Sequence, residues 1–208
     1  LLEYNRTVKI NLKQGAIKAT IDRVLSLLLV FLLFPLMLII GILVKLDSRG
    51  PVFFMQRRCG LGGEEFLMYK FRTMVQGADD FKDALSSETD GPVFKIKKDP
   101  RVTRIGRILR RWSLDELPQL LNVLSGQMSL VGPRPLENVE MQGNDHWRTV
   151  RLSVKPGITG LWQIYGRDSC KFSDWIKYDV EYVQNMSLRL DIRILLTTTA
   201  AIVRKKGT

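Results

Sequence analysis

A run of 21 residues without a charge, Val24 to Val44, constrains this chain more than any other feature of its sequence. As an α-helix, a run of this length measures about 30 Å, the thickness of the hydrocarbon core of a bilayer. A signal peptide would have a shorter apolar stretch and then a small-residue cleavage site, which Lys45-Leu46-Asp47 does not provide. The run therefore predicts a membrane-embedded helix.

The flanks and the centre of this run bear on how it sits in the membrane. Basic residues lie on both sides, with Arg23 before it and Lys45 after it, whereas a spanning helix usually has a basic excess at its cytoplasmic end only. Pro35 removes a backbone donor and predicts a kink near Phe34. Both a re-entrant helix-break-helix over residues 21–46 and a kinked spanning helix fit this pattern.

Composition excludes several classes of protein. Of the 208 residues, 45% are hydrophobic, which is too many for a disordered chain. Cys59, Cys170 and the single His146 are too few for a zinc site, an iron–sulfur site or a disulfide scaffold. The net charge of +11 suits nucleic acid, lipid headgroups or phosphorylated substrates, and the membrane segment favours the last two.

The remaining pattern predicts an α+β protein. Residues 51–58 and 65–74 are β-leaning runs joined by a glycine-rich turn, which is typical of a hairpin. Alternation along the second strand would place Lys70 and Arg72 on one face, where two cations suit an anionic ligand.

Three further segments are expected to be helical. Residues 95–111 concentrate Lys and Arg, and apolar residues recur at helical spacing in their second half, which predicts an amphipathic helix. Residues 173–183 also have a helical pattern. Residues 188–206 end in three basic residues and are expected to form either an interfacial helix or a core helix.

Two adjacent carboxylates, Asp115 and Glu116, directly follow the basic helix. Because Pro118 is tolerated only in the first turn of a helix, Asp115 is expected to be the N-cap of the next one. A helix N-terminus attracts phosphate and lowers the pKa of a carboxylate, so Asp115 is expected to be ionised beside a phosphate site that includes Arg110. Such a group suits a nucleophile toward phosphorus or a Mg²⁺ ligand, and an ordinary helix cap is the alternative.

Seven blocks of sequence occur in a recognisable order. They are the apolar run with its proline, then DSRGPVFF (47–54), YKFRTM (69–74), DPRVTRIGR (99–107), SLDELPQ (113–119), SLVGPRP (129–135) and KPGITG (155–160). In these blocks the chain resembles the bacterial sugar transferase family, the monotopic phosphoglycosyl transferases that act on polyprenyl phosphate. The resemblance covers roughly Lys18 to the C-terminus and leans toward long-form members, of which this chain would be the catalytic C-terminal part.

The resemblance implies an activity. A sugar 1-phosphate would pass from a UDP-sugar to polyprenyl (undecaprenyl) phosphate, releasing UMP and initiating the assembly of a surface glycan such as an exopolysaccharide. Asp115 would be the nucleophile that forms a covalent phosphosugar intermediate. Glu116 and Mg²⁺ would assist, with both carboxylates as metal ligands. Direct transfer in a ternary complex is the alternative route.

The resemblance also implies substrate-binding residues. Arg110 matches the phosphate-binding arginine of the family, and Arg134 and Pro133 lie in a Pro-Arg-Pro motif that shapes the nucleotide site. Lys70 and Arg72 are further candidate anion contacts.

In the implied architecture, residues 1–20 form an N-terminal interfacial segment and residues 21–46 a re-entrant membrane helix. Residues 47–208 form a small catalytic domain that ends in an interfacial helix, at the cytoplasmic face of the bacterial inner membrane. The family commonly has Ser before the helix-breaking proline, where this chain has Phe34, which cannot satisfy a carbonyl freed at the break.

The expected partners are a UDP-sugar, polyprenyl phosphate and the lipid bilayer, without nucleic acid, and a homo-oligomer is compatible with the sequence. The identity of the sugar is not indicated. A different class of function is a non-catalytic membrane adaptor that binds anionic lipid or nucleic acid through the basic helix. The Asp-Glu pair argues against it, because attachment requires no carboxylate there.

Overall fold

The computed structural model describes residues 12–81, 96, 98–142, 145–166 and 171–204. Over these residues the chain combines helices with two small sheets, which confirms the predicted α+β class. The helices are α1 (Leu12–Asp47), α2 (Arg104–Trp112), α3 (Gln119–Leu124), α4 (Asp145–Leu152), α5 (Phe172–Asn185) and α6 (Leu188–Arg204). The strands are β1 (Phe53–Cys59), β2 (Glu65–Phe71), β3 (Ser129–Val131) and β4 (Gly157–Thr159).

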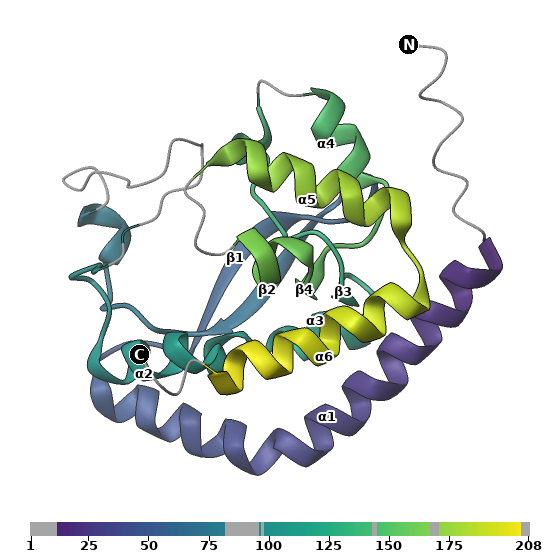
Figure 1. The fold of residues 1–208 in the computed structure, drawn as a ribbon. Helices are drawn as coiled ribbons and strands as arrows, with labels where there is room; N and C mark the ends of the chain where they lie inside the picture. Colours follow the sequence, from purple (N-terminus) through teal and green to yellow (C-terminus); the bar gives the residue numbers. More distant parts are fainter. Residues whose placement is uncertain (1–11, 82–95, 97, 143–144, 167–170, 205–208) are drawn as a thin grey trace.

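Helix α1 contains the predicted membrane segment and is long and apolar enough to cross a membrane. It is one helix with Pro35 inside it, so the expected break is a bend within a continuous helix. Figure 1 shows its two arms curving along the lower side of the fold. The re-entrant topology stays a prediction. Residues 1–11 of the expected interfacial segment lie outside the described residues, and the helix continues through residue 20.

The predicted hairpin is confirmed: β1 and β2 pair antiparallel, with Phe53 opposite Phe71 and Cys59 opposite Glu65. The second sheet is a parallel pair of β3 and β4, in which Ser129 lies opposite Gly157. A Cβ added at Gly157 would lie 2.0 Å from the backbone nitrogen of Gly132, so the close approach of these two segments requires glycine.

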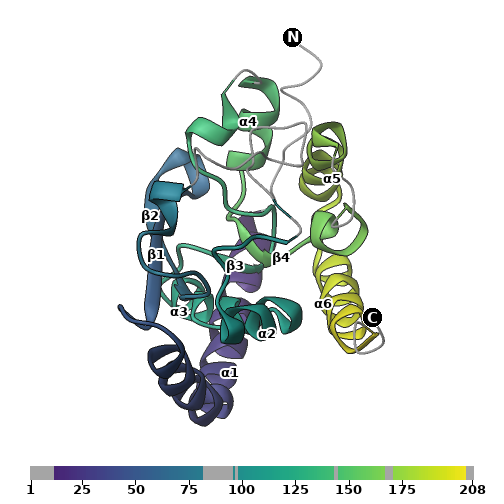
Figure 2. The same ribbon diagram turned by 90° about the vertical axis from the view of Figure 1, so that its left-hand side faces the viewer.

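The elements form layers around the β3–β4 pair. Figure 2 shows the hairpin on one side of this pair and α5 and α6 on the other, with α4 at the end farthest from α1. The predicted amphipathic helix is α2, and the predicted helix over 173–183 is α5. Helix α6 has features of both of its expected roles, because Ile194 is buried in the core while Ile192 and Leu196 are exposed.

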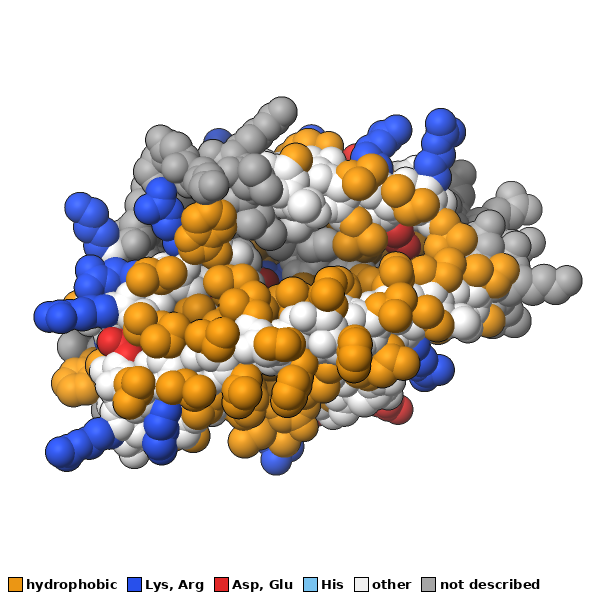
Figure 3. Space-filling model, turned by 90° about the horizontal axis from the view of Figure 1, so that it is seen from below, with side chains coloured by type: hydrophobic (Ala, Val, Ile, Leu, Met, Phe, Trp, Pro, Cys, Tyr) orange, Lys and Arg blue, Asp and Glu red, His pale blue; other side chains and the backbone are white. Residues whose placement is uncertain are grey.

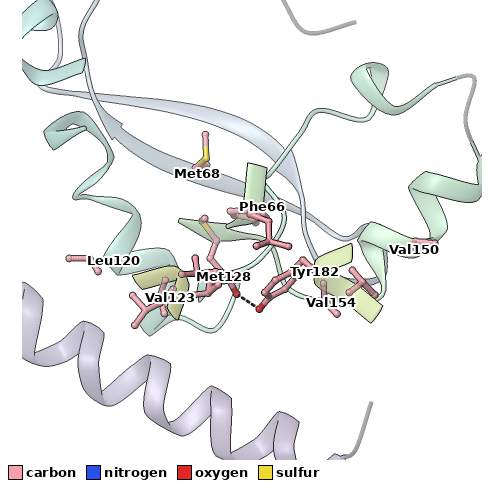
Figure 4. Close-up of a cluster of buried hydrophobic side chains, with 13 residues drawn as sticks. Phe66, Met68, Leu120, Val123, Met128, Val150, Val154 and Tyr182 are labelled. Carbon is pink, nitrogen blue, oxygen red and sulfur yellow. Dashed lines mark hydrogen bonds between the residues drawn. The ribbon is translucent and has the colours of Figure 1, made fainter. Parts of the chain in front are cut away.

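The main hydrophobic core lies between the hairpin, α3 and α5 (Figure 4). Phe66 and Met68 of β2 belong to this cluster together with Val123 of α3, and each side chain fully buried there contributes about 1.5–3 kcal/mol. The hydroxyl of Tyr182 in α5 donates to the carbonyl oxygen of Val131, 2.9 Å away. This contact fixes α5 to β3.

Buried polar contacts attach the first arm of α1 to the rest of the fold. Lys18 Nζ lies 2.7 Å from a carboxylate oxygen of Asp191 in α6, and Asp22 accepts a 2.6 Å hydrogen bond from the Ser129 hydroxyl. The Tyr182 hydroxyl also lies 2.8 Å from a carboxylate oxygen of Asp191, so its one proton is shared between this oxygen and the Val131 carbonyl. This arm is therefore held against β3, α5 and α6.

The other end of α1 is attached beside the hairpin. The guanidinium of Arg72 donates to the carbonyl oxygens of Val44, Ser48 and Arg49, which are the unpaired acceptors at and after a helix C-terminus. Asp47 accepts a 3.0 Å bond from the backbone nitrogen of Ile105 at the start of α2. The end of the membrane helix thus meets both β2 and α2.

Candidate active site

The Asp115–Glu116 pair lies in a tight turn between α2 and α3. Ser113 adopts a left-handed conformation, with φ 56° and ψ 24°, which ends α2, and its N–H donates to the carbonyl of Arg110. The turn η4 (Leu114–Glu116) follows directly and is a single 3₁₀ turn. This places both carboxylates beside the last turn of the basic helix.

The expectation that Asp115 caps the next helix is wrong. Helix α3 begins at Gln119, its N-cap position is Pro118, and no side chain bonds to it there. The reason is that the 3₁₀ turn takes up residues 114–116, so Asp115 precedes α3 by too many residues to reach its first amides.

The side chain of Asp115 is buried, with 9% of its surface exposed. Burial is the main reason that its pKa is raised, and Glu116 raises it further, whereas Lys70 and Arg110 lower it. The sequence-based expectation of a lowered pKa is therefore wrong, because desolvation outweighs the neighbouring cations. A buried carboxylate with a raised pKa is more basic than usual, and such groups cluster at functional sites.

Glu116 is shared by two cations from different parts of the chain. Lys70 Nζ on β2 lies 3.2 Å from Glu116 Oε1, and a guanidinium nitrogen of Arg134 lies 3.8 Å from the same oxygen. Burial lowers the pKa of Lys70, while Glu116 raises it. The arrangement brings two positive charges to one carboxylate.

Arg110 lies on the last turn of α2 and interacts electrostatically with Asp115. Its Nε donates to the hydroxyl of Thr73, 2.9 Å away, just after β2. This bond orients the guanidinium beside the carboxylate pair.

A small pocket, partly open to solvent, adjoins this cluster. It is lined by Met68, Lys70, Glu116, Gln119, Arg134, Pro135, Gly157, Ile158 and Gln163. The pocket lining therefore combines two cations and a carboxylate with uncharged residues. Such a combination suits a ligand that has a phosphate group attached to a neutral part.

The structure brings together five of the predicted site residues: Lys70, Arg110, Asp115, Glu116 and Arg134. It places the other two predicted residues, Arg72 and Pro133, in structural roles. Arg72 follows the last residue of β2, so the strand alternation does not extend to it, and its guanidinium binds the end of α1 instead of sharing a site with Lys70.

Pro133 is buried, and its carbonyl accepts a 2.8 Å bond from the nitrogen of Gly157. It supports the main chain of the motif, whereas Pro135 and Arg134 line the pocket.

Sequence reasoning missed Met68, Gln119 and Gln163. The alternation argument contained the signal for Met68, which shares a strand face with Lys70. Gln163 lies on the π-helical turn η6 (Trp162–Gly166), for which periodicity has no signal. Gln119 is almost fully buried at the start of α3 and resembles any polar helix residue in sequence.

The carboxylate pair is compatible with a magnesium ion. Within the described ranges no group of three or more His, Cys, Asp or Glu side chains is placed to hold a metal ion. Magnesium is commonly held by only one or two carboxylates together with substrate phosphates and water. Asp115 and Glu116, next to the cations that suit a phosphate, match this pattern.

Comparison with known proteins is informative for nearly the whole chain. The family described as "Bacterial sugar transferase" matches residues 13–205. The exopolysaccharide production protein ExoY of Rhizobium meliloti is 39% identical over 93% of this chain and 88% of its own length. The UDP-glucose:undecaprenyl-phosphate glucose-1-phosphate transferase of Xanthomonas campestris is 43% identical over 95% of this chain and 43% of its own length. The undecaprenyl-phosphate galactose phosphotransferase of Salmonella typhimurium is 40% identical over 92% of this chain and 41% of its own length.

Proposed function

Because this chain belongs to the bacterial sugar transferase family, we propose that it is a phosphoglycosyl transferase that moves a sugar 1-phosphate from a UDP-sugar to undecaprenyl phosphate. The family membership is the one that the sequence blocks predicted. The observation that carries the proposal is the convergence of Lys70, Arg110 and Arg134 on the Asp115–Glu116 pair, beside a pocket that Lys70, Glu116 and Arg134 line.

A membrane-bound acceptor is supported by the surface beside this site. Figure 3 shows hydrophobic side chains gathered over the face that contains α1, with Lys and Arg toward its edges. On α1 the side chains of Phe31, Leu32 and Phe34 are 85%, 71% and 61% exposed. Side chains of this size are rarely exposed together unless they meet a membrane or a partner. We place this face in the cytoplasmic leaflet of the inner membrane, with α1 re-entrant.

In the proposed reaction Asp115 is the nucleophile. A carboxylate oxygen of Asp115 forms a bond to the phosphorus that carries the sugar, and the bond from this phosphorus to UMP breaks, so that UMP leaves with the electron pair. An oxygen of undecaprenyl phosphate then attacks the same phosphorus and releases Asp115. Lys70, Arg110 and Arg134 stabilise the negative charge that develops on the phosphate oxygens.

Glu116 positions the cations in this scheme. Its contacts with Lys70 and Arg134 hold both side chains at the pocket. A magnesium ion held by Asp115 and Glu116 would neutralise charge on the diphosphate of the donor.

The test uses the chain in detergent or nanodiscs with UDP-sugars, Mg²⁺ and undecaprenyl phosphate. We expect UMP release and a lipid-linked sugar phosphate. Without the lipid acceptor we expect about one UMP per enzyme and a phosphosugar on Asp115 that mass spectrometry detects. Direct transfer in a ternary complex would produce neither of these two signals.

Asp115→Asn is expected to abolish UMP release, and Asp145→Asn, at an exposed position of α4, serves as the matched control. UMP release by Asp115→Asn at an undiminished rate would refute the assigned nucleophile. A non-catalytic adaptor would bind anionic vesicles in a salt-dependent way, independently of Asp115, and release no UMP.

A further inference from the structure

Gln163 is one of the residues that line the pocket beside the candidate active site. It is on the π-helical turn η6, which follows β4, and it lines the same pocket as Lys70, Glu116 and Arg134. Short π-helical segments are rare and occur frequently at functional sites.

The turn that carries Gln163 is firmly held. The indole of its neighbour Trp162 packs on Trp175 of α5, with 4.1 Å between ring centroids. The guanidinium of Arg134 lies 5.8 Å from the ring of Trp162. Trp162 therefore links η6 to Arg134, which lines the pocket.

The amide oxygen of Gln163 has no hydrogen-bond partner among the residues that the structure describes, and it is shielded from solvent. It lies over Gly160, where an added Cβ would be only 3.0 Å away. A buried acceptor without a donor destabilises a fold, and such a group in a native structure calls for an explanation. The terminal torsion of glutamine is soft, so the amide can turn toward a ligand in the pocket that Gln163 lines.

The residues that line the pocket with Gln163 indicate which kind of ligand group would donate a hydrogen bond to its amide oxygen. Besides the charged residues, the lining includes the uncharged residues Pro135, Gly157 and Ile158. A neutral ring with hydroxyl groups suits these uncharged residues, while a phosphate suits Lys70 and Arg134. In a nucleotide sugar, the sugar is attached directly to the phosphate that would be attacked.

We propose that Gln163 accepts a hydrogen bond from a hydroxyl of the transferred sugar and thereby contributes to the choice among UDP-sugars. This inference rests on the proposed function. It adds a sugar-recognition residue to the pocket next to the catalytic carboxylates.

The test compares wild type with Gln163→Met, which has a similar shape but no amide. For both proteins kcat/KM is measured with UDP-glucose, UDP-galactose, their N-acetylated counterparts, and deoxy analogues of the best substrate. We expect Gln163→Met to lose about tenfold in kcat/KM with the best sugar, the effect of one neutral hydrogen bond. The analogue that lacks the contacted hydroxyl should be used equally well by both proteins.

Two further readouts separate sugar recognition from a structural effect. Gln163→Met should unfold at the same temperature as wild type or higher, because the buried amide oxygen that it removes makes no hydrogen bond within the described part of the chain. Inhibition by UMP should be unchanged, because UMP lacks the sugar. Gln127→Met is the matched control, since Gln127 follows α3, outside the pocket lining, and should leave sugar preference unchanged.

The inference is overturned if Gln163→Met keeps full activity, if all deoxy analogues show the same loss, or if UMP inhibition weakens in parallel. A wild-type chain that releases no UMP with any UDP-sugar would instead overturn the proposed function and the inference with it. Wild-type activity combined with one of the first three outcomes would overturn only the role of Gln163.

Discussion

Lys70 Nζ lies 3.2 Å from Glu116 Oε1, and this ion pair joins the second strand of the hairpin to the turn that holds the carboxylates. The two residues are 46 positions apart in the chain. Because both side chains are largely shielded from solvent, the pair orients the cation of Lys70 toward the pocket while neutralising part of its charge.

Lys70→Met should weaken both catalysis and folding. We expect kcat/KM for the UDP-sugar to fall at least about tenfold, because a charge-assisted contact to phosphate is lost, and the free energy of unfolding to fall by about 1–3 kcal/mol. Initial rates and denaturant unfolding measure the two effects. Lys177→Met, at an exposed position of α5, is the control. Equal rates for the two variants would contradict a substrate contact by Lys70.

Asp115→Asn should separate activity from stability. Since the folded-state pKa of Asp115 is raised, its contribution to stability is complete below about pH 4 and is lost as pH rises through the folded pKa. At pH 7 the variant should therefore unfold at a temperature equal to or above that of wild type, with activity reduced by about a thousandfold or more.

Thermal unfolding at pH 4 and pH 7 measures this difference. The unfolding temperature of Asp115→Asn should exceed that of wild type by more at pH 7 than at pH 4. A variant that is destabilised at pH 7 relative to wild type would show that Asp115 is stabilised as an anion, contrary to the effect of its burial.

Arg72→Met should destabilise the fold without a direct effect on substrate binding. Arg72 binds three carbonyl oxygens at the end of α1, so we expect a loss of about 1.5–3 kcal/mol and an unchanged KM for the UDP-sugar in the folded fraction. Arg57→Met is the control, because the Arg57 side chain is 80% exposed and its pair with Glu65 is worth less than about 1 kcal/mol. A raised KM for the UDP-sugar with unchanged stability would show that Arg72 contacts the substrate.

Arg151→Met should affect the site indirectly. The buried guanidinium of Arg151 lies 3.5 Å from Asp179 and donates to the carbonyl oxygen of Arg134. Removing it leaves a buried carboxylate, which costs about 3–5 kcal/mol, and frees the main chain of Arg134, so KM for the UDP-sugar should rise.

The double variant Arg151→Met with Asp179→Leu provides the control for this effect. It should regain much of the stability, since no unpaired buried charge remains, while KM stays raised. If KM recovers together with stability, Arg151 has no separate role in positioning Arg134.

The topology of α1 is testable by labelling. Ala16→Cys and Arg49→Cys, both at exposed positions near the ends of α1, are introduced separately into a background that lacks the native cysteines. A re-entrant helix predicts that an impermeant thiol reagent reaches both positions from the same side of inner-membrane vesicles. Labelling from opposite sides would establish a spanning helix.

Several features followed from local sequence pattern. The uncharged run predicted the long exposed helix, strand alternation and glycines predicted the hairpin, and the spacing of Ile105, Ile108 and Leu109 predicted α2. The ordered blocks also predicted the family and five residues that the structure brings together. These features depend on residues that are close in the chain, or on a pattern that the whole family shares.

The tertiary structure decided which groups are desolvated and which of them meet. Arg72 and Lys70 look alike in sequence, yet one binds the end of α1 and the other binds Glu116, because the chain changes direction where β2 ends. The pKa of Asp115 is raised where its helical context predicted the opposite, and Gln163 acquires an unpaired amide oxygen at the pocket. The burial of a polar side chain depends on contacts with distant segments, so the neighbouring residues in the sequence carry no signal for it.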